Sequence, residues 1–273
     1  MSTAPASDGL RVDDVDRVRY LTIDRPEKRN ALTPSLLARL VDAVVEAEAA
    51  QDVGCIVLRG AGAAFCAGMD IDPAETDMGF DERSFADELV LLDQFRRLED
   101  IWRSRTPVIA SVHGYCLGVG TDLAFCCDMT LAAEDAQFGY PPVRSMGAPP
   151  SHMWTYLAGP QWAKRLLLTG DMIDGATAAR AGFVLEALPA DELERATHEL
   201  ADRIARVPPD VLAANKSMCN KVLELMGRTL AQELAREVNT MAHQSPHAVE
   251  FGRRATERGL KAALAWQDER FSR

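Results

Sequence analysis

Apolar residues in the first 190 positions recur with two different periods. Apolar residues from Leu36 to Val45 follow helical spacing, and Thr33 followed by Pro34 just before them is typical of a helix N-terminus. A second helical pattern covers residues 85–102. Four apolar runs have the length and composition of buried strands: 18–24, 55–60, 107–112 and 129–133. Because these predicted strands alternate with the predicted helices, the pattern predicts an α/β fold with largely parallel strands.

The pattern changes after Pro189. From there to the C-terminus the spacing is helical, and it is interrupted by residues that end or begin helices: Pro208-Pro209, Gly227, Ser245-Pro246 and Gly259. We therefore expect three parts: a flexible N-terminal tail at 1–14, an α/β core at 15–195 and a helical C-terminal region at 196–273.

Composition and charge narrow the possible partners. The 273 residues are 47% hydrophobic and 26% charged, as in a globular protein with a large core. The net charge of −11 disfavours nucleic acid and anionic membrane surfaces as partners. A small anionic ligand is still compatible, because Arg25, Lys28 and Arg29 form a local basic cluster. A solvated loop explains that cluster equally well.

The cysteines and the N-terminal residues indicate the compartment. The six cysteines form no CxxC pair and several lie in apolar runs, which predicts buried, reduced thiols rather than disulfides or a zinc site. The first ten residues lack the basic and apolar regions of a signal peptide, and no apolar run is long enough to span a bilayer. We expect a cytoplasmic protein without a bound metal or a membrane partner.

A glycine-rich turn in HGYCLGVGTDLAFCCD, residues 113–128, is the first candidate for chemistry. It follows a predicted strand, but Leu123 stands where a dinucleotide fingerprint needs a third glycine or alanine, and a P-loop lysine is missing. N–H groups at a helix start have no intrahelical acceptor, and Gly118 leaves the Val119 N–H accessible to a ligand oxygen. A tight structural turn explains these glycines as well.

A second strand–glycine–helix unit lies at 55–71, CIVLRGAGAAFCAGMDI, where Ala67 and Gly68 directly precede Met69. Two such turns on adjacent strands would each direct one N–H at a shared point. Two converging donors form an oxyanion hole, and loss of one such donor costs about 3 kcal/mol of transition-state stabilisation.

The ordered blocks of the chain resemble the enoyl-CoA hydratase/isomerase superfamily, the crotonases, over roughly residues 15–270. The resemblance implies a crotonase-like spiral of ββα units with a helical C-terminal region that packs into trimers, often paired as hexamers. It also implies a coenzyme A thioester as substrate and no separate cofactor, since coenzyme A is part of the substrate. The blocks are DRPEKRNAL (24–32), FCAGMDI (65–71), PVIASVHGYCLGVGTDLAFCCD (107–128), AQFGYP (136–141) and TGDMIDGATAARAGFV (169–184).

The resemblance also assigns roles to residues. The peptide N–H groups of Met69 and Val119 would form the oxyanion hole, and Arg29 would contact the coenzyme A phosphates. Asp72 stands where family members often carry a lysine, and Asp70 is expected to cap the local backbone. The other implied substrate- and coenzyme A-binding positions are Ala31, Ala67, Gly68, Asp70, Ile71, Asp72, Gly118 and Pro142.

Catalysis also requires groups that move protons. The first of the two glutamates in the hydratase pattern falls at Asp122, which we expect to be a general acid/base; capping of the following helix is the alternative. The second falls at Pro142 or Val143, neither of which holds a proton. His152, close by in the sequence, is a candidate substitute for the missing acid, but we favour a surface or capping role for it.

The sequence assigns no catalytic or ligand-binding role to the other histidines. His113 precedes the glycine turn and is expected to pack or hydrogen-bond locally. Helical segments contain His198, His243 and His247, without an acidic or cysteine partner at ligand spacing.

Three functions remain open on these grounds. The first is hydration of an α,β-unsaturated acyl-CoA, with the enolate stabilised by the paired N–H groups. The second is another reaction with a single carboxylate: double-bond isomerisation, decarboxylation or C–C cleavage. The third is non-catalytic acyl-CoA binding. The stretches 72–95 and 140–156 are expected to line the acyl pocket, and the apolar and aromatic residues of the latter favour a bulky acyl group or simply pack in the core.

Overall fold

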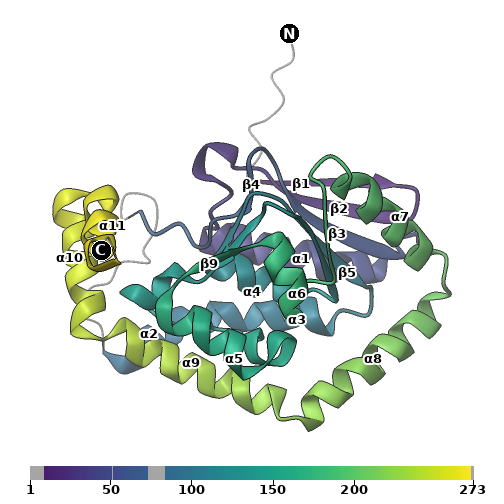
Figure 1. The fold of residues 1–273 in the computed structure, drawn as a ribbon. Coiled ribbons are helices and arrows are strands. Elements are labelled where there is room, and N and C mark those ends of the chain that lie inside the picture. The colour runs from purple at the N-terminus through teal and green to yellow at the C-terminus, as the bar shows by residue number, and fades with distance from the viewer. Residues whose placement is uncertain (1–8, 51, 73–83, 272–273) are drawn as a thin grey trace.

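The computed structural model describes residues 9–50, 52–72 and 84–271 (Figure 1). The main sheet has the strand order β1-β2-β3-β5-β7-β10, in which only the β1–β2 pair is antiparallel. The predicted parallel α/β core is thus confirmed, and the four expected strands are β2, β3, β5 and β7. The strands are β1 (Leu10–Val15), β2 (Val18–Ile23), β3 (Cys55–Gly60), β5 (Val108–Val112), β7 (Met129–Ala133) and β10 (Glu186–Leu188).

A second, four-stranded sheet positions the site. Its strands are three residues long, and each of the first three follows a strand of the main sheet, which produces the expected repetition of strand, strand and helix. β4 and β6 are parallel neighbours, as are β6 and β8. In sheet order the strands are β4 (Ala64–Cys66), β6 (Tyr115–Leu117), β8 (Gln137–Gly139) and β9 (Met172–Asp174).

The helices of the core form where the periodicity indicates them. The Thr33 hydroxyl accepts a hydrogen bond from the Leu36 N–H and caps α1, as predicted. The pattern at 85–102 forms two α-helices joined by the 3₁₀ turn η2. The bounds are η1 (Pro26–Lys28), α1 (Pro34–Ala49), α2 (Phe85–Leu92), η2 (Asp93–Arg97), α3 (Leu98–Arg103), α4 (Val119–Phe125), η3 (Pro141–Arg144), α5 (Trp154–Thr169) and α6 (Gly175–Ala181).

The C-terminal region is helical throughout its described residues, and its breaks fall where proline, serine and glycine predict them. Figure 1 shows α8 and α9 running along the side of the molecule away from the main sheet, with α10 and α11 packed together beyond them. The bounds are α7 (Leu193–Ala205), α8 (Pro209–Leu225), α9 (Arg228–His243), α10 (Pro246–Arg258), α11 (Leu260–Asp268) and η4 (Glu269–Phe271).

Two predicted boundaries were wrong. The expected tail at 1–14 overlaps β1, because residues 10–15 pair along β2; residues 1–8 lie outside the described part of the chain. The expected boundary at 195 falls inside α7. This helix buries Leu193, Thr197 and Ala201 on one face and packs against β3, β5 and β7, so it belongs to the α/β core.

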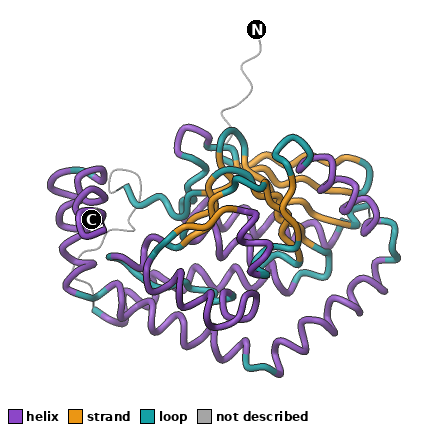
Figure 2. The backbone as a smooth tube through the Cα atoms, viewed as in Figure 1, coloured by secondary structure: helices purple, strands orange, loops and turns teal. Residues whose placement is uncertain are grey.

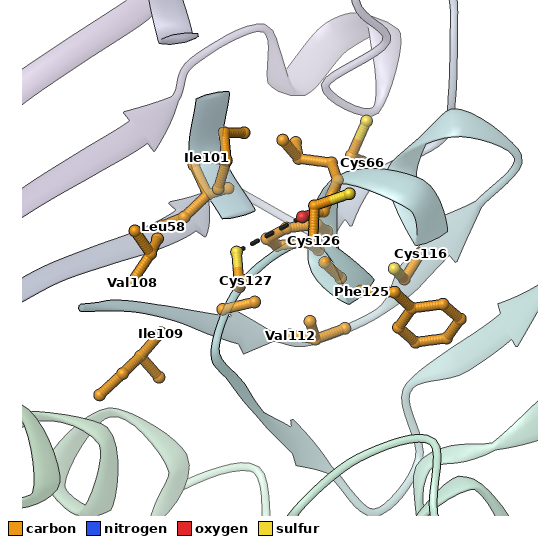
Figure 3. Close-up of a cluster of buried hydrophobic side chains, with 14 of the residues drawn as sticks. Leu58, Cys66, Ile101, Val108, Ile109, Val112, Cys116, Phe125, Cys126 and Cys127 are labelled. Carbon is orange, nitrogen blue, oxygen red and sulfur yellow. Dashed lines mark hydrogen bonds between the residues drawn. The ribbon is translucent and has the colours of Figure 1, made fainter. Parts of the chain in front are cut away.

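The strands lie among the helices (Figure 2), and buried residues of both form the main core. Figure 3 shows one part of it, where the thiols of Cys66, Cys116, Cys126 and Cys127 lie among aliphatic side chains. The prediction of buried thiols is confirmed for all cysteines except Cys219, which is exposed. Over the described ranges, no helix is both long and apolar enough to cross a membrane.

Candidate active site

The two glycine turns lie against each other. They follow β4 and β6, which are parallel neighbours, so both segments leave the second sheet at the same edge. A Cβ atom on Gly68 would lie 3.0 Å from the Leu117 carbonyl oxygen and 3.6 Å from the Val119 nitrogen. Gly68 has a φ of +104° and Gly118 a φ of +54°, in the left-handed region that favours glycine. The contact between the turns therefore needs glycine at 68.

The backbone pairing sets the direction of the two candidate N–H groups. Leu32 donates to the Gly68 carbonyl at 2.8 Å and accepts from the Asp70 N–H at 2.7 Å. In such a parallel bridge the N–H of the residue between, Met69, faces away from Leu32. Val119 is the first residue of α4, so its N–H has no intrahelical acceptor.

Met69 and Val119 border one cavity. Among the hydrogen bonds of the described residues, neither the Met69 nor the Val119 N–H donates to a protein acceptor. Both residues line a cavity of about 380 Å³. This is the arrangement that an oxyanion hole requires; binding of one oxygen by both donors stays a prediction.

The same cavity collects most of the residues that the resemblance implies for substrate binding. All of them line it except Arg29 and Asp122. The expected acyl-pocket stretches contribute as well, although residues 73–83 lie outside the described chain. The implied residues in the lining are Ala31, Ala67, Gly68, Met69, Asp70, Ile71, Asp72, Gly118, Val119 and Pro142, and those from the acyl-pocket stretches include Phe95, Tyr140, Pro141, Met146 and Pro150.

The basic cluster before α1 divides into three different roles. Arg25 pairs with Asp70 at 3.1 Å and donates to the Ala31 carbonyl at 2.6 Å, so it holds the first glycine turn. The Arg29 guanidinium lies over the Tyr115 ring, 5.3 Å from its centroid, outside the cavity lining. Lys28 is the cation of this cluster that lines the cavity. The contact of Arg29 with a coenzyme A phosphate stays a prediction, and within the described residues Arg29 lies outside the cavity lining whereas Lys28 lies in it.

The two aspartates after Met69 shape this rim. Asp70 accepts a hydrogen bond from the Asp72 N–H at 3.3 Å through Oδ1, which confirms the expected local cap. Asp72 forms an ion pair with Lys28, with 3.7 Å between Oδ2 and Nζ. The carboxylate at 72 thus pairs with a cation that lines the cavity.

Asp122 is fully buried on α4, one helical turn after Val119. Its Oδ1 accepts hydrogen bonds from the Ser151 N–H at 3.1 Å and the Ser151 hydroxyl at 2.5 Å. Oδ2 has no hydrogen-bond partner within the described residues. Burial raises the pKa of Asp122 to about 7, while the Ser151 hydrogen bonds oppose the rise. The carboxyl is not part of the cavity lining, and its catalytic role stays a prediction.

The position of the second carboxylate in the hydratase pattern is apolar. The Pro142 ring faces the second glycine turn, with its Cγ 3.5 Å from where a Cβ on Gly118 would lie. Val143 packs against the main core. His152 does not line the cavity, and burial lowers its pKa. His113 donates to the Gly62 carbonyl at 2.8 Å, which confirms the local role expected for it.

One histidine to which the sequence analysis gave no chemistry lies at the cavity, beside an acidic partner that the sequence did not indicate. His243 lines the cavity, and its Nδ1 lies 2.8 Å from the Glu88 carboxylate. The two residues are 155 positions apart and lie on α9 and α2, so no local spacing relates them. The C-terminal helices also supply Asn239, Leu260 and Leu264 to the lining.

A spiral of paired strands and helices with two amide donors at one cavity defines an enzyme of the crotonase type. The family model for enoyl-CoA hydratase/isomerase matches residues 14–262. The chain therefore belongs to the enoyl-CoA hydratase/isomerase family, within the crotonase superfamily.

Solved and curated relatives agree with this family. The crystal structure of an enoyl-CoA hydratase from Mycobacterium smegmatis superimposes with a TM-score of 0.89 at 33% identity, covering 96% of this chain and 94% of that one. The 2,3-dehydroadipyl-CoA hydratase of Escherichia coli K12 is 33% identical over 82% of this chain and 87% of its own length. The hydroxycinnamoyl-CoA hydratase-lyase of Pseudomonas fluorescens is 31% identical over 79% of each chain.

Proposed function

We propose that this protein is an enoyl-CoA hydratase, which adds water across the Cα=Cβ bond of an α,β-unsaturated acyl-CoA thioester. The observation that carries the proposal is that Met69 and Val119 line one cavity, while their peptide N–H groups donate to no protein acceptor among the described residues. A thioester oxygen that accepts both hydrogen bonds withdraws electrons from the double bond, which makes the β-carbon electrophilic. The donors then stabilise the enolate that forms when water attacks.

Asp122 is the acid/base group in this scheme. Its pKa of about 7 keeps both protonation states populated near neutral pH, which suits a residue that takes and returns a proton. It lies one helical turn behind Val119, so the acid/base group and one oxyanion donor share a helix. The unpaired Oδ2 is a buried polar atom that a water or a substrate proton would satisfy.

The remainder of the cavity suits the rest of the substrate. Lys28 is the residue we assign to a coenzyme A phosphate, because it is a cation in the cavity lining, although it also pairs with Asp72. The lining around Phe95, Tyr140 and Pro142 favours an apolar acyl group. Two relatives whose names specify hydratases of acyl-CoA substrates support the proposed hydratase reaction.

The test is loss of the enoyl-thioester absorbance with crotonyl-CoA and with longer and aromatic enoyl-CoAs. Asp122→Asn is expected to lower kcat by about 10²–10⁴-fold, the usual contribution of a general acid/base. Asp128→Asn is the matched control, because the Asp128 side chain is only 18% exposed but its carboxylate pairs with Lys216 at 2.7 Å. Equal kcat values in the wild type and Asp122→Asn would remove Asp122 from the mechanism.

A second candidate function follows from the apolar Pro142 at the position of the second carboxylate. A single carboxylate is sufficient for double-bond isomerisation, and decarboxylation or C–C cleavage would use the same oxyanion hole. Mass spectrometry of the products separates these reactions, because hydration adds one water and isomerisation adds nothing. Tight acyl-CoA binding in calorimetry without turnover of any substrate would instead indicate a binding protein.

We further propose that the protein is a homotrimer, or a hexamer of two trimers. α8 and α9 carry large apolar side chains that are exposed in the isolated chain. An exposed apolar surface of this extent favours association with another protein surface. These residues are Val211, Met218, Val222, Leu225, Leu230, Leu234, Val238 and Met241.

A further inference from the structure

We propose that the substrate is an enoyl-CoA whose acyl group carries, near its far end, an uncharged oxygen that accepts hydrogen bonds, such as a ketone or a hydroxyl. This oxygen binds to Gln232 and Arg236 in a second cavity beside the active site. The inference rests on the enoyl-CoA hydratase function proposed above and names the class of acyl group that the enzyme selects.

The second cavity, which we call the distal cavity, adjoins the active-site cavity. It has a volume of about 290 Å³. The residues that line it come mainly from the segment 92–103 and from helix α9 (Figure 1). Phe95, Pro150 and Asn239 line both cavities, so the two cavities share a wall.

One residue of this lining contacts the proposed acid/base group. Ser151 lines the distal cavity and donates two hydrogen bonds to Oδ1 of Asp122. In the proposed reaction the thioester oxygen binds at Met69 and Val119, and the α-carbon faces Asp122. The acyl group beyond the double bond then continues past Asp122 toward Ser151. We therefore assign the distal cavity to the far end of the acyl group.

The distal cavity has an apolar wall and a polar wall. Leu92, Phe95 and Leu98 are buried and form the apolar wall. Helix α9 supplies Gln232 and Arg236, which lie one turn apart on the same face of the helix. An acyl group that fills this cavity with hydrocarbon alone would exclude water from the polar wall without replacing its hydrogen bonds, which costs free energy.

The polar wall carries two N–H donors that lack an acceptor. Among the residues that the structure describes, Nε2 of Gln232 and Nε of Arg236 are buried and have no hydrogen-bond partner. A buried donor without an acceptor is unfavourable, so an acceptor on the ligand relieves that cost. A carbonyl or hydroxyl oxygen has two lone pairs, as many as there are donors on this wall. The wall therefore selects an acyl group with an oxygen at this position.

The ion pairs of the polar wall indicate that this oxygen is uncharged. Arg236 forms ion pairs with Asp93 and Glu233, and Arg96 pairs with Glu233 at 2.7 Å. The two cations and two anions of this cluster balance each other. A carboxylate at the end of the acyl group would add a third negative charge or displace one of the two acids. An uncharged oxygen uses the free donors and leaves the ion pairs intact.

The test uses the full-length protein and trans-2-enoyl-CoAs of several chain lengths. At each length, kcat/KM is compared for an apolar chain, the same chain with a ketone near its end, and the same chain with a terminal carboxylate. At the length that reaches the distal cavity, the ketone is expected to exceed the other two by about tenfold or more. In the opposing interpretation, water satisfies the two donors and the ketone gives no advantage.

Gln232→Leu removes one donor and keeps a side chain of similar size. This variant is expected to lower kcat/KM for the ketone substrate by about tenfold, with the value for the apolar substrate within about threefold of the wild type. A loss confined to one substrate identifies a contact with that oxygen, because a general loss of stability would affect both substrates.

Gln137→Leu is the matched control. The Gln137 amide donates to the Asp135 carbonyl at 3.0 Å, and the residue lies outside both cavity linings. This variant is expected to keep the wild-type preference for the ketone substrate.

The inference is overturned if the wild type shows no preference for the ketone at any chain length, if it prefers the carboxylate, or if Gln232→Leu keeps the preference. If Gln232→Leu does not fold, Gln232→Glu decides, because it replaces the donor by an acceptor of nearly the same shape. A retained preference for the ketone in that variant overturns the inference, and its loss supports it.

The failure of the inference is distinguishable from the failure of the proposed function. A wild type that hydrates apolar and ketone substrates equally well is a hydratase without the proposed selectivity. A wild type that turns over no enoyl-CoA overturns the hydratase function. Calorimetry with the saturated acyl-CoAs of the same three types then tests the inference separately, since tighter binding of the ketone supports it and equal binding overturns it.

Discussion

Ser151 donates two hydrogen bonds, one from its backbone N–H and one from its hydroxyl, to the same oxygen of Asp122. The other carboxylate oxygen, Oδ2, has no partner among the residues described. Ser151 favours the ionised carboxylate, whereas complete burial favours the protonated one, and burial has the larger effect. Asp122 therefore changes its protonation state near neutral pH.

The first prediction concerns stability and pH. The pKa of Asp122 rises from 3.8 to about 7 on folding, so its contribution to stability is complete below pH 3.8 and is lost as the pH rises through 7. Asn at this position does not titrate. Between pH 4 and 8, urea unfolding is expected to show the wild type losing up to about 4 kcal/mol relative to Asp122→Asn. A difference between the two proteins that does not change with pH would contradict the raised pKa.

The second prediction concerns the pH dependence of activity. Ser151→Ala removes the hydroxyl donor that lowers the pKa of Asp122, so that pKa rises. The inflection in the kcat profile that belongs to Asp122 is expected to move to higher pH by about one unit. Ser145→Ala serves as the control, because the buried Ser145 hydroxyl has no hydrogen-bond partner in the described part of the chain. If the inflection of Ser151→Ala stays at the wild-type pH, Ser151 does not lower the pKa of Asp122.

The third prediction concerns the contact between the glycine turns. Gly68→Ala places a Cβ 3.0 Å from the Leu117 oxygen, so the turns must separate, whereas Gly259→Ala meets no atom within 4 Å. Both positions have positive φ, and each alanine is expected to cost about 1–2 kcal/mol of unfolding free energy. Only Gly68→Ala is expected to lower kcat, by about 10²-fold or more. Equal activity in the two variants would argue against an oxyanion hole at these turns.

The fourth prediction concerns a buried cation. Arg228 is completely buried, donates to both Glu99 oxygens at 2.8 Å and lies 3.7 Å from the Trp102 ring centroid. Arg228→Ala leaves Glu99 without this partner and is expected to destabilise the protein by about 3–5 kcal/mol in urea unfolding. Arg253→Ala removes an exposed pair with Glu250 and is expected to cost less than about 1 kcal/mol. Similar losses of unfolding free energy in both variants would contradict the expectation that the buried ion pair stabilises the protein more than the exposed one.

The fifth prediction tests the trimer. Leu234 is 52% exposed within the apolar residues of α8 and α9, and Leu168 on α5 is 80% exposed outside them. Leu234→Glu places a charge in the proposed interface and is expected to shift the mass from trimer or hexamer toward monomer in light scattering. Leu168→Glu is expected to keep the wild-type mass. A monomeric wild type would refute this proposal.

The long periodic elements could be predicted, because the spacing of apolar residues within each element shows which of its faces is buried. The strand at 55–60 is buried nearly throughout, and α1 repeats its leucines at helical spacing behind the Thr33 cap. The three-residue strands were not predictable, since β4 and β6 are too short to show a period and exist through pairing with each other. For the same reason β1 was missed: its exposed face depends on the register with β2.

The same distinction applies to the candidate site: features set by local sequence could be predicted, and features set by packing could not. Met69 and Val119 each follow a glycine directly, so their place at the cavity could be predicted from motif positions. Arg29 and Lys28 are adjacent, and only packing decided which one borders the cavity. The pair of Glu88 and His243 joins positions 155 residues apart, which no local pattern relates.

By itself, the amino-acid sequence determined the periodic strands and helices, the glycine turns and the carboxylate at 122. Those features depend on residue type and on neighbours a few positions away. Only the tertiary structure decided the protonation balance of Asp122, the cation at the cavity rim and the histidine that faces Glu88. Burial and the approach of distant side chains are properties of the folded chain, and they decide what each titratable group can do.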